Sequence, residues 1–249
     1  MNGGRDDGAK TAARDAILDR IRASHGRGPA DEVTAARLAS RISGHRRGTV
    51  PKRVARDEAA LLALFVEQAE ALSATVARVA SPNDVPGAVA DYLARENLPA
   101  RLRAAPSPVV RDLDWDSRPA LEVSYGASDG NDEVGLTGAF AAVAETGTLI
   151  LVSGAERPTT LNFLPDTHIV VLHRDQVVGP YEAVWDRLRD AGAMPRTVNF
   201  VSGPSRTADI EQTILLGAHG PRRLHIVLVD APGSSEARGS AEAGDDDGE

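Results

Sequence analysis

Four short, uninterrupted runs of Ile, Val and Leu in the second half of the chain constrain its fold most strongly. Because polar residues do not alternate with apolar ones inside them, these runs predict strands that are buried on both faces, as in parallel α/β sheets. Helices predicted at 180–191 and 207–216 separate some of these strands, which is typical of a layered α/β domain. The four runs are Thr148–Ser153, His168–His173, Thr197–Ser202 and Leu224–Asp230.

The preceding segment continues the alternation of helices and strands. Asp57 is a predicted N-cap for a helix over 58–72, and Ser81-Pro82 begins a second helix over 83–96, since Pro is favoured at the first helical position. We therefore predict one three-layer α/β/α domain over residues 57–230. Its further strands are expected at 75–79, 100–104, 121–125 and 134–137.

Charge divides the chain into three parts. Residues 1–56 carry 13 Lys and Arg against 6 Asp and Glu, and they predict a basic helical arm with helices that begin at Thr11 or Asp15 and at Asp31. Residues 57–230 carry 14 cationic against 24 acidic side chains. Residues 231–249 hold six acidic residues and almost no large apolar ones, so we predict a disordered acidic tail, and disorder over 1–9 as well.

The chain contains no cysteine among its 249 residues, which excludes disulfide bonds, cysteine-ligated zinc, iron–sulfur ligation by this chain and a thiol nucleophile. It has no His-Glu-x-x-His motif, so no metal site is predicted, and no G-x-G-x-x-G motif for a nicotinamide cofactor. No apolar run approaches the ~18 residues of a membrane span, and the polar N-terminus predicts a cytoplasmic protein. Since the basic arm lacks interleaved aromatic residues, we expect no nucleic-acid partner.

Three segments place reactive side chains where strands meet loops, and ligands of open α/β sheets bind outside the carboxyl ends of strands. The first segment surrounds Glu145, the one carboxylate in a run of small residues directly before the strand at 148–153. A carboxylate in apolar surroundings can act as an acid, a base or a nucleophile, so Glu145 is a candidate catalytic residue. Alternatively, Glu145 hydrogen-bonds the local backbone and caps a turn.

The second segment follows the strand at 197–202 and contains Ser202, Gly203, Ser205, Arg206 and Thr207. If these residues open the helix predicted at 207–216, its free N–H groups and the Arg206 guanidinium form a site for a carboxylate or phosphate. Alternatively, they cap the helix, and Arg206 pairs internally with Asp209 or Glu145. The pattern is neither a Walker loop nor a G-x-S-x-G elbow.

The third segment is the loop Gly217-Ala218-His219-Gly220-Pro221, just before the strand at 224–230. A histidine in such a loop is accessible and suited to proton transfer, so His219 is a second candidate catalytic residue. The alternative is a turn histidine that bonds to the backbone.

Three multi-residue blocks follow one another in the second half of the chain. They are Ala-Glu-Thr-Gly-Thr at 144–148, Ser-Gly-Pro-Ser-Arg-Thr-Ala-Asp-Ile-Glu at 202–211 and Gly-Ala-His-Gly-Pro at 217–221, and a shorter block, Leu-Pro-Asp-Thr-His at 164–168, lies between the first two. Together they resemble the lactate-utilisation protein C family, the stand-alone LUD-domain proteins. The resemblance implies a ribose-phosphate-isomerase/CoA-transferase-like fold and a role in oxidising L-lactate to pyruvate with two iron–sulfur partner proteins. Within the first block, Thr146, Gly147 and Thr148 join the candidate anion-binding residues.

Two hypotheses about function follow. In the first, the chain is a non-redox subunit of the lactate system that binds a small carboxylate or phosphate, with Arg206 as the clamp and the basic arm docking partners. Because the chain has no cysteine, we expect no cofactor on it and place the iron–sulfur clusters on the partner proteins. In the alternative, the chain is an independent enzyme of the CoA-transferase or sugar-phosphate-isomerase class that uses Glu145.

Overall fold

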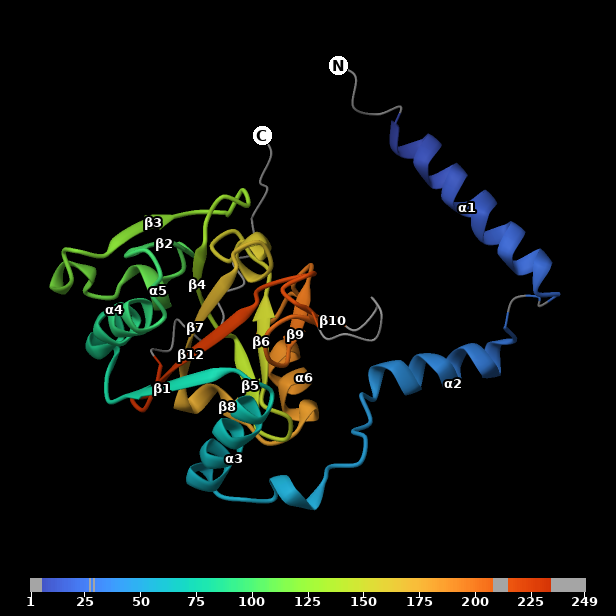
Figure 1. Ribbon diagram of the computed structural model, residues 1–249. Coiled ribbons are helices and arrows are strands. Elements are labelled where there is room, and N and C mark those ends of the chain that lie inside the picture. The colour runs from blue at the N-terminus through green and yellow to red at the C-terminus, as the bar shows by residue number, and fades with distance from the viewer. Residues whose placement is uncertain (1–5, 27, 29, 208–214, 234–249) are drawn as a thin grey trace, which may run out of the picture. The chain divides into compact units, whose positions relative to one another are not determined.

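The computed structural model describes residues 6–26, 28, 30–207 and 215–233. Residues 1–5 and 234–249, which make up most of the ends predicted to be disordered, lie outside the described residues. The chain divides into two units, Met1–Gly48 and Thr49–Glu249. The second unit contains the layered sheets and helices of Figure 1.

The first unit consists of two helices, as predicted. α1 spans Asp6–Ser24 and α2 spans Glu32–Ser43. α1 begins earlier than expected, within the segment predicted to be disordered, because the Ala- and Lys-containing sequence at 9–13 favours a helix. Asp31 caps α2 by accepting a hydrogen bond from the backbone N–H of Thr34 at 2.7 Å. Val33 and Ile42 remain 80% and 73% exposed, so the described residues of α2 contribute to no core.

A parallel sheet of six strands forms the centre of the second unit, in the order β1-β12-β7-β4-β2-β3 (Figure 1). β7 and β12 pair over seven residues and are almost completely buried, as their continuous apolar sequence predicts. The predicted parallel α/β architecture is therefore confirmed. The strands are β1 Thr75–Val79, β2 Arg101–Ala104, β3 Glu122–Tyr125, β4 Val134–Gly138, β7 Thr167–His173 and β12 Arg223–Val229.

Alternate residues of the central strands enter two different cores, because successive side chains of a strand point to opposite faces. Val170 and Leu172 pack in one cluster with Phe65 of α3. Ile169 and Val171 pack in the other with Val89 of α4. The helices are α3 Glu58–Ala71, α4 Val85–Arg95, α5 Pro108–Arg111 and α6 Tyr181–Asp190. Short 3₁₀ turns lie at Lys52–Val54, Pro82–Asp84, Trp115–Ser117, Thr159–Asn162 and Arg174–Gln176.

A second sheet of four strands, in the order β8-β5-β6-β9, corrects part of the prediction. The runs at 148–153 and 197–202 were expected in the parallel sheet, but β6 pairs antiparallel with both β5 and β9. A continuous apolar run signals burial on two faces and carries no information on strand direction. β6 is buried on both sides because Leu149 packs with Phe65 and Ile150 packs with Val184 of α6. The strands are β5 Ala141–Val143, β6 Thr148–Val152, β8 Val177–Val178 and β9 Val198–Val201.

The helix predicted at 207–216 is wrong at both of its described ends. β10 at Arg206–Thr207 pairs antiparallel with β11 at Leu215–Leu216, and residues 208–214 lie outside the described residues. Pairing between the two ends of the segment therefore overrides the local helical pattern that Ser205 and Arg206 suggested. Arg206 and Thr207, which were expected at the N-terminus of a helix, therefore lie in a strand.

Two glycine turns press directly on the last turn of α3. Gly147 has φ +62°, and a Cβ at this position would lie 2.4 Å from the backbone nitrogen of Ala69. Gly203 has φ +78°, and its Cβ would lie 2.5 Å from the carbonyl oxygen of Leu72. Both positions need glycine, first for the left-handed backbone and second for the close approach of two main chains.

We expect Gly147→Ala to destabilise the protein by roughly 2–5 kcal/mol, because a side chain at positive φ is strained and would overlap the backbone of α3. Gly154→Ala is the matched control, since its Cβ would meet nothing nearer than the Cβ of Arg157 at 4.0 Å; we expect a change below about 0.5 kcal/mol. Urea unfolding of both variants measures the difference. Equal stabilities would show that α3 does not constrain this turn.

Candidate functional site

Two of the three predicted segments meet and form a small pocket. The backbone N–H of Ser205 donates to the carbonyl of Pro221 at 2.8 Å, and the N–H of Gly217 donates to the carbonyl of Ser205 at 3.0 Å. The N–H of His219 also approaches the Ser205 hydroxyl oxygen at 3.4 Å. The pocket has a volume of about 230 Å³ and is lined by Asn162, Phe163, His168, Phe200, Val201, Ser202, Gly203, Pro204, Ser205, His219, Gly220, Pro221 and Leu224.

The pocket lies at the amino ends of two parallel strands, and this corrects the expected location. His168 is the second residue of β7 and Leu224 the second residue of β12, whereas ligands were expected at the carboxyl ends of the parallel strands. The reason is the second sheet. β9 runs antiparallel to β6 in the second sheet. The loop that follows β9 lies at the end where the parallel strands begin, and there it contacts the loop that precedes β12.

His168 is a pocket residue that the sequence did not single out. It is 1% exposed, and its Nε2 lies 2.8 Å from the Thr137 hydroxyl. Its Nδ1 is buried and has no hydrogen-bond partner among the described residues. Burial disfavours the charged imidazolium and lowers the pKa of His168 to about 3. The ring is therefore neutral at physiological pH. The block at 164–168 contains His168, but its place in the site could not be predicted, because it depends on Thr137 from a neighbouring strand.

Four hydroxyl groups form a closed network beside the pocket. The Thr148 hydroxyl lies 2.7 Å from Thr146, 2.9 Å from Tyr181 and 2.7 Å from Ser202. Tyr181 and Thr146 are 2.8 Å apart. The pairing of β6 with β9 brings Thr148 and Ser202 together, because each lies next to the last pair of the ladder, Leu149 and Val201. Tyr181, the first residue of α6, was not predicted, since no local pattern connects it to the threonines.

The other predicted site residues lie outside this lining. Glu145 is 14% exposed at its side chain and pairs with Arg53 at 3.1 Å, a residue from the segment predicted as arm. The Arg206 guanidinium donates to the Leu72 carbonyl at 3.0 Å and to the Ser73 hydroxyl. Gly147 packs on α3, and Thr207 of β10 pairs with Leu215 of β11. The structure thus gathers Ser202, Gly203, Ser205 and His219 in the pocket and connects Thr146 and Thr148 to it through Ser202.

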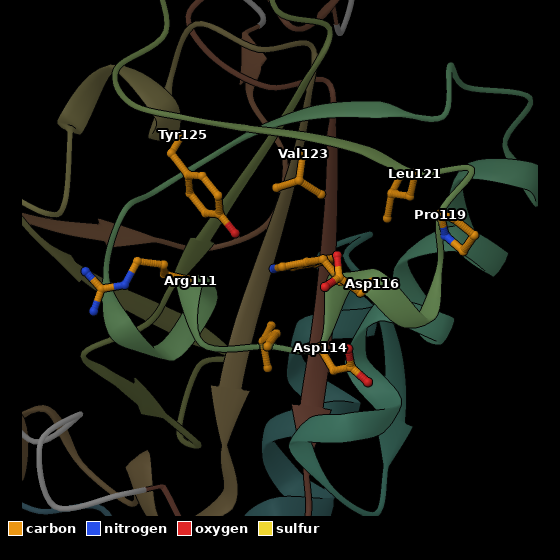
Figure 2. Close-up of a pocket in the computed structure, with 9 residues that line it drawn as sticks. Arg111, Asp114, Asp116, Pro119, Leu121, Val123 and Tyr125 are labelled. Carbon is orange, nitrogen blue, oxygen red and sulfur yellow. The ribbon is translucent and has the colours of Figure 1, made fainter.

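A larger cavity of about 580 Å³ lies beside the edge strand β3 (Figure 2). Tyr125 and Val123 face it from β3, and Arg111 and Asp116 lie across from them. Arg111 is engaged by Asp112 at 3.1 Å and Glu156 at 3.8 Å. None of the predicted site residues lines this cavity, so its size alone gives it no functional assignment.

Within the described part of the chain, no helix is long and apolar enough to cross a membrane. The same residues hold no group of three or more His, Asp or Glu side chains arranged to bind a metal ion.

The fold and the pocket define an α/β domain with a small site to which two loops contribute hydroxyl and imidazole groups. The LUD domain family matches residues 62–229, and the chain belongs to this family. The crystal structure of a DUF162 family protein from Deinococcus radiodurans superposes with a TM-score of 0.53 and 28% identity, covering 70% of this chain and 99% of that one.

Curated relatives support the same assignment. Lactate utilization protein C of Deinococcus radiodurans is 37% identical over 157 residues, 60% of this chain and 70% of that protein. Its counterpart in a Geobacillus species is 30% identical over 119 residues, 46% and 48% of the two chains. An uncharacterized protein of Neisseria meningitidis is 39% identical over 100 residues, 40% and 43%. The chain thus spans about half the length of most relatives that it matches.

We expect burial of His168 to make stability depend on pH. Its pKa of about 3 in the folded protein lies below the ordinary value of 6.5, so below pH 6.5 the unfolded chain takes up a proton that the folded protein does not. The free energy of unfolding therefore falls, by up to about 1.4 kcal/mol per pH unit from this residue.

Unfolding of the wild type and His168→Gln between pH 6.5 and pH 4 measures this contribution. The Gln amide offers a partner to Thr137 but does not titrate, and all carboxylates are common to both proteins. We expect the variant to lose less stability as the pH falls. Identical slopes for the two proteins would contradict a neutral, buried His168.

Proposed function

We propose that this chain serves L-lactate utilisation as a subunit without redox ligands that binds a small carboxylate, such as lactate, in the pocket between Ser202 and His219. The observation that carries the proposal is the convergence of Ser202, Ser205 and His219 in one cavity. We assign the chain to this pathway because several relatives are named lactate utilization protein C. The absence of cysteine from the sequence supports placing the iron–sulfur chemistry on partner proteins.

The size and the polar groups of the pocket suit a small acid. A volume of about 230 Å³ lies below the roughly 300–1,000 Å³ of sites for drug-sized ligands, which favours a ligand of few atoms. The Ser205 hydroxyl accepts from the backbone of His219, so its own proton is available to a carboxylate. An imidazole N–H of the exposed His219 supplies a second donor. Phe163 and Phe200 provide an apolar wall for a methyl group.

The basic arm is the proposed contact for partner proteins. Residues 1–56 carry an excess of seven positive charges, and α2 leaves Val33, Leu38 and Ile42 exposed. A surface that combines positive charge with an apolar stripe suits an acidic protein partner, because opposite charges steer association. We assign this partner to the iron–sulfur proteins of the lactate system. Glu145 receives no chemical role in this proposal, since it pairs with Arg53 away from the pocket.

We expect isothermal titration calorimetry to detect binding of L-lactate to the full chain. Ser205→Ala and His219→Ala each remove one donor and should weaken binding by roughly tenfold. Arg206→Gln is the control, because Arg206 bonds to α3 outside the pocket; its affinity should stay within about twofold of the wild type. Absence of lactate binding, or a loss confined to Arg206→Gln, would contradict the proposed site.

Growth on L-lactate as the sole carbon source tests the pathway. Deletion of the gene should abolish this growth, and the wild type and Arg206→Gln should restore it, whereas Ser205→Ala/His219→Ala should not. Charge reversal of the arm by Arg37→Glu/Arg41→Glu should leave lactate binding intact but prevent co-purification of the iron–sulfur proteins. Normal growth of the deletion strain would refute the proposed pathway.

A further inference from the structure

The hydroxyl network has a fixed hydrogen-bond direction at Ser202. Among the described residues, four hydroxyls make four hydrogen bonds with one another: Thr146–Thr148, Thr146–Tyr181, Thr148–Tyr181 and Thr148–Ser202. Each hydroxyl carries one proton and can accept two hydrogen bonds. Four bonds therefore need all four protons, and every hydroxyl must donate exactly once within the network.

Ser202 takes part in only one of these four bonds, so it must be the donor to Thr148. Thr146, Thr148 and Tyr181 then donate around a three-membered ring, and either direction of that ring leaves Ser202 unchanged. Thr148 donates once and accepts twice, which is the full capacity of a hydroxyl. If Ser202 turned its proton into the pocket instead, three protons would serve four contacts, and one pair of oxygens 2.7–2.9 Å apart would have no proton between them.

The hydroxyls of Ser202 and Ser205 consequently present one acceptor and one donor to the pocket. Ser202 is exposed and lines the pocket, and its oxygen offers only lone pairs there. Ser205 lines the same pocket, and its oxygen accepts from the backbone N–H of His219, so the Ser205 proton can be donated to a ligand. A ligand that matches both must carry a hydrogen-bond acceptor for Ser205, such as a carboxylate oxygen, and a hydrogen-bond donor for Ser202.

We propose that the pocket selects 2-hydroxy acids over 2-oxo acids and that Ser202 is the residue that determines this specificity. The inference rests on the proposed function, because it assigns a substrate class to the same pocket. The C2 hydroxyl of a 2-hydroxy acid donates to Ser202. The C2 carbonyl of a 2-oxo acid has only lone pairs, which face the lone pairs of Ser202 and leave this oxygen without a partner. The pocket therefore distinguishes the reduced from the oxidised acid without a redox group.

Removing one hydroxyl from the ring tests the inference without altering the pocket lining. In Tyr181→Phe, two bonds remain for three protons, so Ser202 is no longer forced to donate to Thr148 and can turn its proton to a carbonyl. Thr146→Val also leaves two hydrogen bonds for three hydroxyl protons, because the Thr148–Tyr181 and Thr148–Ser202 bonds remain. Tyr125→Phe is the matched control, since Tyr125 lies on β3 and outside the network.

Calorimetry with L-lactate and pyruvate, and with 2-hydroxybutyrate and 2-oxobutyrate as a second pair, measures the preference in each protein. We expect the wild type and Tyr125→Phe to bind the hydroxy acid roughly tenfold more tightly than the oxo acid. In Tyr181→Phe and Thr146→Val the ratio should fall below about threefold, with thermal unfolding confirming that both variants are folded.

The possible results separate the two proposals. Equal binding of both acids by the wild type, or an undiminished preference in Tyr181→Phe and Thr146→Val, overturns the assigned specificity while the carboxylate site stands. Binding of neither acid overturns the proposed function and the specificity with it. A ratio that falls in both ring variants and persists in Tyr125→Phe supports the inference.

Discussion

The last turn of α3 is the surface on which both predicted loops rest. Gly147 and Gly203 approach its backbone so closely that a Cβ would lie 2.4 Å and 2.5 Å from main-chain atoms. These contacts place the loops before β6 and after β9 against one element. The hydroxyls of Thr148 and Ser202 meet as a consequence.

The polarity of the pocket follows from this placement. Thr148 and Ser202 lie next to the last pair of the ladder between β6 and β9. The Tyr181 hydroxyl completes a ring with Thr146 and Thr148, and Thr148 accepts the Ser202 proton. The Ser202 oxygen is therefore a neutral hydrogen-bond acceptor on the wall of the pocket. Under the proposed function, this domain binds the acid while other proteins transfer its electrons.

The sequence predicted the elements of the fold better than their connections. Asp57 capped α3 as expected, and β1 matches its predicted range of 75–79, because caps and apolar periodicity act locally. The antiparallel direction of β6 and the β10–β11 pair depend on contacts between distant segments, which periodicity does not encode. The same applies to the site. Ser205 and His219 belonged to recognisable loops, whereas His168 and Tyr181 gain their roles only through Thr137 and Thr148.

A crystal structure of the full chain with bound L-lactate tests the central claim most directly, because it shows which ligand atom meets each hydroxyl. The account predicts the C2 hydroxyl of lactate within hydrogen-bond distance of the Ser202 oxygen. The lactate carboxylate should lie against Ser205 and His219, with Ser202 still bonded to Thr148. A carboxylate oxygen on Ser202, or lactate bound outside this pocket, would contradict it.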